Sequence, residues 1–210
     1  TFIRTAEQSG LIKQLSEWVI DTACSDLAIL QGIDPEMRAG INLSMHNLHD
    51  FRLMLHIKEA LSRNRLKAES LLLEITETGV MLDPDQVIEI LEQLASIGLK
   101  LSIDDFGTGH SSLVHLRRLP VHTLKVDKSF VIDMDSDEEN ASIVRATIDL
   151  AHSLGLTVTA EGVETRAVHD LLRDMGCDYY QGYYIGKPMT MAETEHWLGN
   201  GRNLLQDALQ

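Results

Sequence analysis

Acidic and amide side chains recur in this sequence at the ends of short apolar runs. Two neighbouring acids stand in the string S-I-D-D-F-G, and a lysine and an acid alternate in L-K-V-D. Oxygen ligands of this kind suit hard divalent cations such as Mg²⁺ or Mn²⁺, whereas the clustered histidines and cysteines that favour Zn²⁺ are missing. The candidate residues are Asn42, Glu74, Asp104, Asp105, Lys125, Asp127, Glu161, Glu164 and Gln181.

The adjacent acids Asp104 and Asp105 favour more than one cation. Each could serve a different ion, and a pair of divalent ions is a common device for cleaving phosphodiester bonds. Any one of these residues, taken alone, could equally well be a helix N-cap or form a hydrogen bond at a strand end. Their shared position in the chain pattern is therefore the argument for a functional site.

The apolar runs alternate with amphipathic stretches, which is the pattern of a parallel α/β sheet or barrel. Strands that are buried on both faces are expected to be almost entirely apolar, so polar residues at their ends are costly unless they are used. In a closed parallel barrel the carboxyl ends of the strands meet at one mouth, which carries the chemistry. The predicted strands are residues 41–44, 70–76, 99–104, 123–127, 156–161 and 179–184.

Helix ends are marked between these strands. Asp83 and Pro84 are expected to open a helix that ends at Gly98. Thr190 and Glu193 are expected to form a capping box before the last helix. A repeat, S-I-G-L-K-L-S-I-D at 96–104 and S-L-G-L-T-V-T-A-E at 153–161, ends in an acid each time, so one helix–strand unit is used twice.

The composition limits the classes of function. With 18 basic and 32 acidic side chains in 210 residues, the formal charge is −14, so a DNA or RNA partner is not expected. Cys24 and Cys177 show neither metal-ligand nor disulfide-framework spacing, which favours a reducing, cytoplasmic setting. No apolar run approaches the roughly 20 residues of a membrane span. No Pro-, Gly- or Ser-rich linker divides the chain, so residues 1–210 are predicted to be one domain.

The strings NLS, EITE, DDFGTGHSSL, LKVDKSF, AEGVET and GCDYYQGYYIGKPM resemble, in order and spacing, the EAL family of cyclic di-GMP phosphodiesterases. The resemblance covers almost the whole chain. It implies a TIM-like (β/α)8 barrel that hydrolyses cyclic di-GMP to linear pGpG with two Mg²⁺ or Mn²⁺ ions. By the same resemblance, Asn42, Glu74 and Asp104 would hold the first ion. Asp104 and Asp105 would be shared towards the second, and Glu161 would bind that ion or its waters.

The resemblance also assigns roles around the metals. Lys125 would contact the nucleophilic water, and with Glu161 it forms the expected catalytic pair. Gln181 and Glu164 would belong to the substrate pocket or orient the metal ligands. Asp127 lies two residues from Lys125 and therefore on its face of the strand, which suggests a supporting role.

A loop at residues 106–112 has a regulatory role in the family. Glu77 would hold this loop, which links dimerisation to metal binding, so a homodimer through the adjacent helix is expected. Position 110 is His where the family often has Tyr, which is expected to tune a loop contact. The parent protein is expected to carry sensor or GGDEF-type domains, and the family resemblance leaves room for a membrane anchor in the parent.

No strand candidate carries the Glu-Ala-Leu motif from which the family takes its name, or the nearby substrate-binding Arg. Residues 2–12 resemble the stretch that follows this motif. The missing Glu is therefore expected before Thr1, and the chain is expected to be an EAL-type barrel without its first strand or strands.

Other interpretations remain open at this point. The chain could be a cyclic di-GMP receptor without catalysis, or an unrelated barrel that uses Mg²⁺ to stabilise an enolate. His49-Asp50 and His169-Asp170 resemble a phosphohydrolase dipeptide but are expected inside helices with packing or surface roles. The acidic run 133–139 is expected to be a solvated loop and helix start. Met134, Met175, Met189 and Met191 are expected to fill the core.

Overall fold

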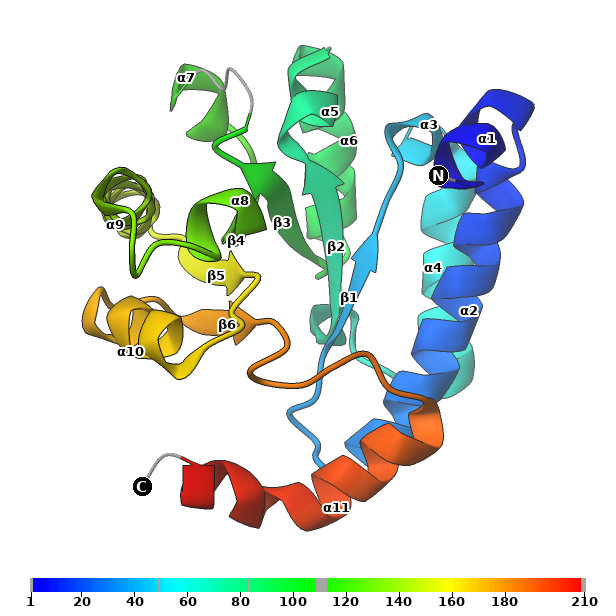
Figure 1. The fold of residues 1–210 in the computed structure, drawn as a ribbon. Coiled ribbons are helices and arrows are strands. Elements are labelled where there is room, and N and C mark those ends of the chain that lie inside the picture. Colours follow the sequence, from blue (N-terminus) through cyan, green and yellow to red (C-terminus); the bar gives the residue numbers. More distant parts are fainter. Residues whose placement is uncertain (1, 49, 83, 109–112, 209–210) are drawn as a thin grey trace.

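In the computed structural model, which describes residues 2–48, 50–82, 84–108 and 113–208, six strands form one curled sheet (Figure 1). All neighbouring strands are parallel, and their order in the sheet follows the chain. The strands are β1 (Ala39–Asn42), β2 (Leu71–Thr76), β3 (Lys100–Phe106), β4 (Thr123–Val126), β5 (Thr157–Glu161) and β6 (Tyr179–Gln181). Each predicted strand is present.

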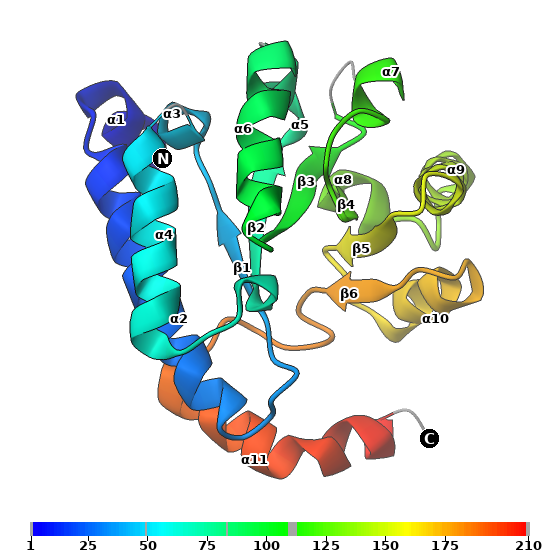
Figure 2. The ribbon, with the colours of Figure 1, turned by 180° about the vertical axis from the view of Figure 1, so that it is seen from behind.

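Helices cover the outer face of the sheet, as both ribbon views show (Figures 1 and 2). The long ones are α2 (Ile12–Gln31), α4 (Phe51–Asn64), α6 (Pro84–Ser96), α9 (Glu138–Ser153) and α10 (Arg166–Asp174). Among the described residues β1 and β6 are not paired with each other, so the sheet stays open. The predicted class, a TIM-like barrel without its first strands, is confirmed.

The shorter helices follow strand ends or join longer helices. They are α1 (Phe2–Ser9), α3 (Met45–Leu48), the 3-10 helix η1 (Ala68–Ser70), α5 (Glu77–Leu82), α7 (Leu113–Leu116) and α8 (Lys128–Val131). The last helix, α11 (Met191–Ala208), lies below the amino ends of the strands in Figure 1. No helix within the described ranges combines the length and the apolarity needed to cross a membrane.

Side chains on the two faces of the sheet differ in kind, because successive residues of a strand point to opposite sides. Leu73, Ile75, Leu101, Ile103 and Leu124 are almost completely buried in the layer between sheet and helices. The inner face carries the polar residues instead. This alternation explains why runs that are mostly apolar end in acids.

The predicted helix boundaries agree with the structure where they can be compared. Val87, Leu91 and Leu94 of α6 are buried as its apolar stripe. Asp83, the expected first cap of α6, lies outside the described residues. The Thr190 N–H donates to Glu193 Oε2 over 2.7 Å, and the Glu193 N–H donates back to Thr190 Oγ1 over 3.4 Å, which is the expected capping box.

Two expectations about local structure are wrong. Asp50 does not lie inside a helix: it precedes α4 as the N-cap and accepts from the Arg52 N–H over 3.1 Å. Its neighbour His49 lies outside the described residues. Met189 is exposed, whereas Met134 is buried in the core as predicted. His169 of α10 is buried against Tyr180, with ring centroids 4.7 Å apart, in agreement with a packing role.

Candidate active site

The polar residues singled out in the sequence lie at matching heights on neighbouring strands. Asn42 is in register with Glu74, and Glu161 with Gln181. Register partners in parallel strands project to the same side of the sheet. The carboxyl ends of β1, β2, β5 and β6 therefore present these side chains together on the inner face.

Lys125 of β4 is the centre of this face. Its Nζ lies 2.6 Å from Glu74 Oε2, 3.1 Å from Asp104 Oδ1 and 2.5 Å from Glu161 Oε1. The acids come from β2, β3 and β5, so one ammonium ties together three strands. We call these four side chains the Lys125 cluster.

The side chains of the Lys125 cluster are largely removed from solvent. Lys125 is 3% exposed, Asp104 8% and Glu74 9%. Burial by itself disfavours the ammonium, but hydrogen bonds to Glu161 and Glu74 and their charges outweigh it and raise the pKa of Lys125 above its ordinary value. In this arrangement Lys125 is therefore protonated at neutral pH. Burial raises the pKa of Glu161, and the charges of Asp104 and Glu74 add to the rise against the opposing effect of Lys125.

A bulge in β3 brings Asp105 to the same side as Asp104. Consecutive residues of a regular strand point to opposite faces. Here the pairing of β3 with β4 shifts register between Ile103 and Phe106, and Asp105 has a φ of 56°. Such a bulge re-aims a side chain, at the cost of a conformation that few non-glycine residues adopt. As a result, carboxylate oxygens of Asp104, Asp105 and Glu161 all lie within 4.8 Å of one another.

Asp127 supports this arrangement from the end of β4. It is the N-cap of α8, and its Oδ1 accepts the Ser129 N–H over 2.9 Å and the Ser129 hydroxyl. Burial would raise the pKa of Asp127, but these bonds and one from Asp105 outweigh it and lower the pKa. Burial and the charges of Asp104, Asp127 and Glu161 raise the pKa of Asp105. A hydrogen bond between the two carboxyl groups contributes to both shifts: it raises the pKa of Asp105 and lowers that of Asp127.

Glu77, at the start of α5, connects β2 to the turn after β3. Its Oε2 accepts the Gly107 N–H over 2.9 Å, and the residue is 1% exposed. The contact is the one expected between Glu77 and the loop at 106–112. Most of that loop, including His110, lies outside the described residues.

The remaining candidates lie at the rim. Asn42, Glu164 and Gln181 are exposed, and among the described residues no side-chain hydrogen bond joins them to the Lys125 cluster. Gln181 lines a cavity of about 630 Å³ that also reaches Lys125 and Glu74 and continues to Lys100 near the amino ends of the strands. The structure thus brings together the buried acids and the lysine, and leaves the amides and Glu164 open to solvent.

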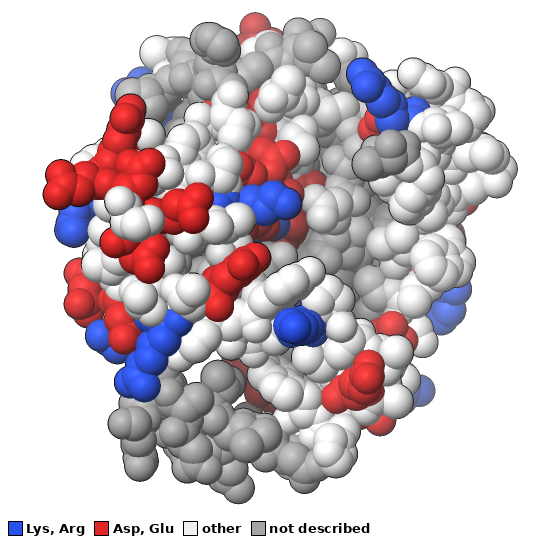
Figure 3. Space-filling model, in the orientation of Figure 1, with Lys and Arg blue, Asp and Glu red and all other residues white. Residues whose placement is uncertain are grey.

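The donor set fits divalent cations. Taken as ionised, Glu74, Asp104, Asp105 and Glu161 carry four negative charges against the single charge of Lys125. Asp104 Oδ1 is buried without a hydrogen-bond partner, although Lys125 Nζ is 3.1 Å away. A buried carboxylate oxygen that accepts no hydrogen bond and lies beside other carboxylates has the chemistry of a ligand for Mg²⁺ or Mn²⁺. In Figure 3 acidic side chains gather in the hollow at the carboxyl ends of the strands, and a second group covers the loop before α9.

The contact of Ser129 with Asp127 was not predicted from the sequence, although a hydroxyl two residues after an acid is a recognisable capping signal. The tripeptide Glu59-Ala60-Leu61 is also present, but it lies in α4 with Glu59 exposed on the outer surface. It is therefore not the strand motif of the resembled family.

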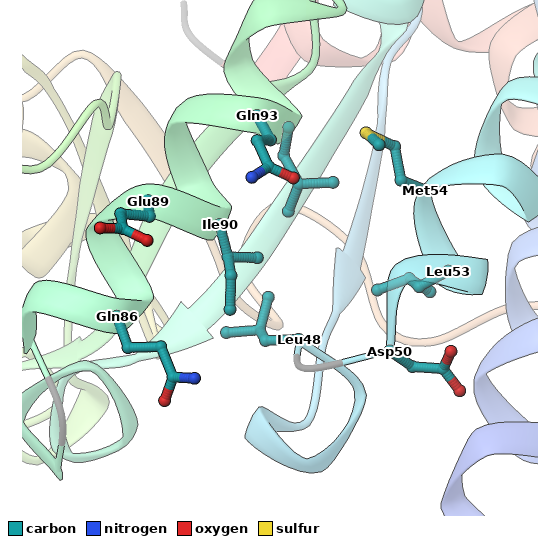
Figure 4. Close-up of a pocket in the computed structure, with 9 residues that line it drawn as sticks. Leu48, Asp50, Leu53, Met54, Gln86, Glu89, Ile90 and Gln93 are labelled. Atoms are coloured by element: carbon teal, nitrogen blue, oxygen red, sulfur yellow. The ribbon is translucent and has the colours of Figure 1, made fainter.

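A second hollow, of about 270 Å³, lies on the outer surface between α4 and α6 (Figure 4). Leu48, Leu53 and Ile90 form much of its lining. Asp50 at its edge is already paired, 3.0 Å from Lys13 Nζ and 3.2 Å from Arg52 Nε. No residue of the Lys125 cluster lines this hollow.

Comparison with known proteins identifies relatives of the chain. The EAL domain family matches residues 1–188. The bifunctional diguanylate cyclase/cyclic di-GMP phosphodiesterase MucR of Pseudomonas aeruginosa is 42% identical over 189 residues, which are 90% of this chain and 28% of MucR. The cyclic di-GMP phosphodiesterase NbdA of the same species is 43% identical over 198 residues, 94% of this chain and 25% of NbdA. The chain thus spans about a quarter of the length of these relatives.

Solved structures support the same assignment. The MucR phosphodiesterase in complex with c-di-GMP superposes with a TM-score of 0.88 at 41% identity, covering 92% of this chain and 78% of that one. The EAL domain of Mycobacterium smegmatis DcpA gives 0.83 at 36% identity, covering 89% and 85%. Sequence match, strand order and the acids at the mouth agree, and the chain belongs to the EAL domain family.

Proposed function

We propose that this chain is a phosphodiesterase domain that hydrolyses cyclic di-GMP to linear pGpG with the help of two Mg²⁺ or Mn²⁺ ions. The observation that carries the proposal is the convergence of Glu74, Asp104, Asp105 and Glu161 around Lys125 at the mouth of the sheet. The names of MucR and NbdA support the substrate. When bound, such ions supply Lewis-acid activation of water and of the phosphodiester.

The residues divide into two groups of ligands. Asn42, Glu74 and Asp104 would hold one ion, and Asp105 and Glu161, with Asp104 shared, the other. Asn42 is exposed next to Glu74, so its amide oxygen is free to join an ion at the rim. The bulge at Asp105 is what makes two neighbouring residues available to one site.

Lys125 has a separate task. Its ammonium is a compact cation with three donors, held by carboxylates in a buried position. It can orient the attacking water by hydrogen bonding and offset charge that develops on the phosphate oxygens. Because its pKa is raised, it does not act as a general base at neutral pH.

The outer residues would bind substrate or support the site. Gln181 and Glu164 are proposed to contact substrate or orient the ligands at the rim, and Asp127 to hold Asp105. Glu77 is proposed to couple the loop after β3 to the site through Gly107. A homodimer, fusion to sensor or GGDEF-type domains, a single domain over residues 1–210 and a cytoplasmic location complete the proposal. The two buried, unbridged cysteines support that location.

Turnover with matched variants tests the enzyme. Cyclic di-GMP would be incubated with the chain and Mg²⁺ or Mn²⁺, and linear pGpG measured by chromatography. We expect Lys125→Ala to lower turnover by about 10²–10³-fold, the usual cost of removing one electrostatic stabiliser. Lys67→Ala, which changes an exposed lysine, should behave as the unchanged chain. Equal turnover by the Lys125→Ala protein would remove Lys125 from the mechanism.

A receptor without catalysis is the second candidate. The strand motif Glu-Ala-Leu is not present in β1 to β6, which would leave one ligand fewer for the first ion. The FimX EAL domain, whose solved structure is bound to c-di-GMP, is 29% identical to this chain. Saturable binding of cyclic di-GMP in the presence of Mn²⁺, with no linear product, would support the receptor and contradict the enzyme.

A further inference from the structure

Gly40 occupies the middle of β1, in register with Leu72 of β2. A glycine inside a strand loses more conformational entropy on folding than other residues and contributes no side chain to packing. Its backbone is not in the left-handed region, unlike that of Gly98 or Gly107. Backbone conformation therefore does not explain the glycine, and the other common reason is the close approach of another group.

The group that approaches Gly40 is the carboxylate of Glu74. A Cβ atom at position 40 would lie 2.5 Å from Glu74 Oε1 and 3.3 Å from Glu74 Cδ. The other carboxylate oxygen, Oε2, is 2.6 Å from Lys125 Nζ. The carboxylate is thus held between the ammonium on one side and the bare α-carbon of β1 on the other.

We propose that Gly40 is a positioning residue for Glu74: the space of its absent side chain fixes where the Glu74 carboxylate lies and hence how the site binds a divalent cation. The proposal rests on the proposed function, in which Glu74 is a metal ligand. Gly40 has no side chain with which to bind an ion. Its effect is transmitted through a side chain that it leaves room for.

A larger residue at position 40 should displace the Glu74 carboxylate without unfolding the domain. The clashing atoms belong to the end of a flexible side chain, and no backbone atom lies within 4 Å among the nearest contacts of the added Cβ. The strand can therefore accept Ala while the carboxylate moves. Val, which adds two further methyl groups, should displace the carboxylate more strongly.

Cation binding tests the proposal. Mn²⁺ affinity of the full chain would be measured by calorimetry for Gly40→Ala, Gly40→Val and, as a matched control, Gly199→Ala, where an added Cβ meets nothing within 4 Å. We expect about 10- to 100-fold weaker binding for the two Gly40 variants, the range found when a ligand loses its support. Gly199→Ala should bind Mn²⁺ as the unchanged chain does. All three should keep cooperative thermal unfolding.

Shortening the acid provides a rescue that a merely structural role would not show. Glu74→Asp withdraws the carboxylate by one methylene, so adding Gly40→Ala to it should weaken Mn²⁺ binding far less than adding Gly40→Ala to the unchanged chain. Full additivity of the two changes would overturn the proposal. So would unchanged Mn²⁺ affinity in Gly40→Val when Glu74→Ala loses binding.

A crystal structure of the metal-free Gly40→Ala protein separates this proposal from the proposed function. A Glu74 carboxylate displaced from its place beside Lys125 supports the positioning role even if the unchanged chain binds no Mn²⁺, a result that would defeat the metal assignment. A Glu74 rotamer identical to that of the unchanged chain overturns the positioning role.

Discussion

At the scale of single residues, the buried ammonium of Lys125 offsets part of the negative charge of several neighbouring carboxylates. Burial and mutual repulsion raise the pKa of Asp105 and of Glu161. A raised pKa means that a proton binds these oxygens more tightly than it binds an ordinary carboxylate. If these oxygens bind metal as proposed, protons and divalent cations would therefore compete for the same atoms.

The first prediction concerns pH. Mn²⁺ affinity should fall as pH decreases through the raised pKa values of Glu161 and Asp105, beginning above the ordinary value of 4.5 for a glutamate. Lys125 stays charged throughout this range because its pKa is raised, so it does not cause the change. Calorimetric titration from pH 8 down to pH 5 measures the effect. An affinity that is flat over this interval would contradict it.

The second prediction is a trade between stability and binding at Asp105. A carboxyl whose pKa is raised in the folded state opposes folding at pH values above that pKa, because the ionised form is disfavoured there. Asp105→Asn removes this repulsion, and Asn tolerates the φ of 56° well. We expect the metal-free variant to melt at a higher temperature than the unchanged chain at pH 7. It should also lose Mn²⁺ affinity.

Thermal unfolding at two pH values supplies the control for that change. The gain in melting temperature should be larger at pH 7 than at pH 4, because protonation of Asp105 in the unchanged chain removes the same charge as the pH falls. A gain of equal size at both values would assign the effect to backbone conformation alone.

At the scale of elements, the ends of the strands decide the geometry. The bulge of β3 aims Asp105, the N-cap of α8 holds Asp127, and the end of β6 holds the loop after β5. In this last contact the Val163 N–H donates to Gln181 O over 3.0 Å, and the Tyr184 N–H donates to Val163 O over 3.0 Å. The predicted strand 179–184 stops at Gln181 because the chain turns around Val163.

Gly182 makes that turn possible, which leads to the third prediction. A Cβ at position 182 would lie 2.2 Å from Val163 O and 2.3 Å from Val163 N, both backbone atoms that cannot yield cheaply. Gly182→Ala should reduce the free energy of unfolding by about 1–3 kcal/mol, the usual cost of overpacking. Urea unfolding measures it. Gly186→Ala in the same loop meets only Met189 Cε at 3.4 Å and should cost much less.

The same elements show what the sequence could predict. The strands and their polar ends were predictable, because acidic residues stand out at the ends of short, mostly apolar segments. The repeat also held: β3 and β5 end near Asp104 and Glu161, each after a glycine with positive φ. The contact between Gly40 and Glu74 was not predictable. The two residues lie diagonally across neighbouring strands, and no local sequence pattern indicates such a contact. Asp50 was misplaced for a related reason: an acid before an apolar run fits a helix cap as well as a helix interior.

At the scale of the whole molecule, charge and architecture act together. The chain has a net charge of −14, and Figure 3 shows acids both in the central hollow and over the loop before α9. The acids of the hollow come from three strands of one sheet, β2, β3 and β5, so much of their repulsion acts between segments that are distant in the chain. Cations that neutralise them should therefore stabilise the whole domain.

The fourth prediction follows by mass action. A ligand at 100 times its Kd adds about 2.7 kcal/mol to stability, which raises the melting temperature of a domain of this size by roughly 5–10 °C. Saturating Mn²⁺ should produce such a rise, and a chelator should reverse it. Asp104→Asn, which alters a carboxylate near the centre of the site, should abolish most of the rise. A melting temperature indifferent to Mn²⁺ and chelator would contradict the proposed metal site.

The ammonium of Lys125 has one more consequence, for how the acids are held together in the absence of a metal ion. It is a counterion attached to the chain, so it cannot diffuse away when dissolved cations are scarce. While it stays within 3.1 Å of Glu74, Asp104 and Glu161, it keeps these three acids together on the inner face of the sheet. If the proposed ions bind, Lys125 would thus preserve the arrangement of these acids in the periods when no ion is bound.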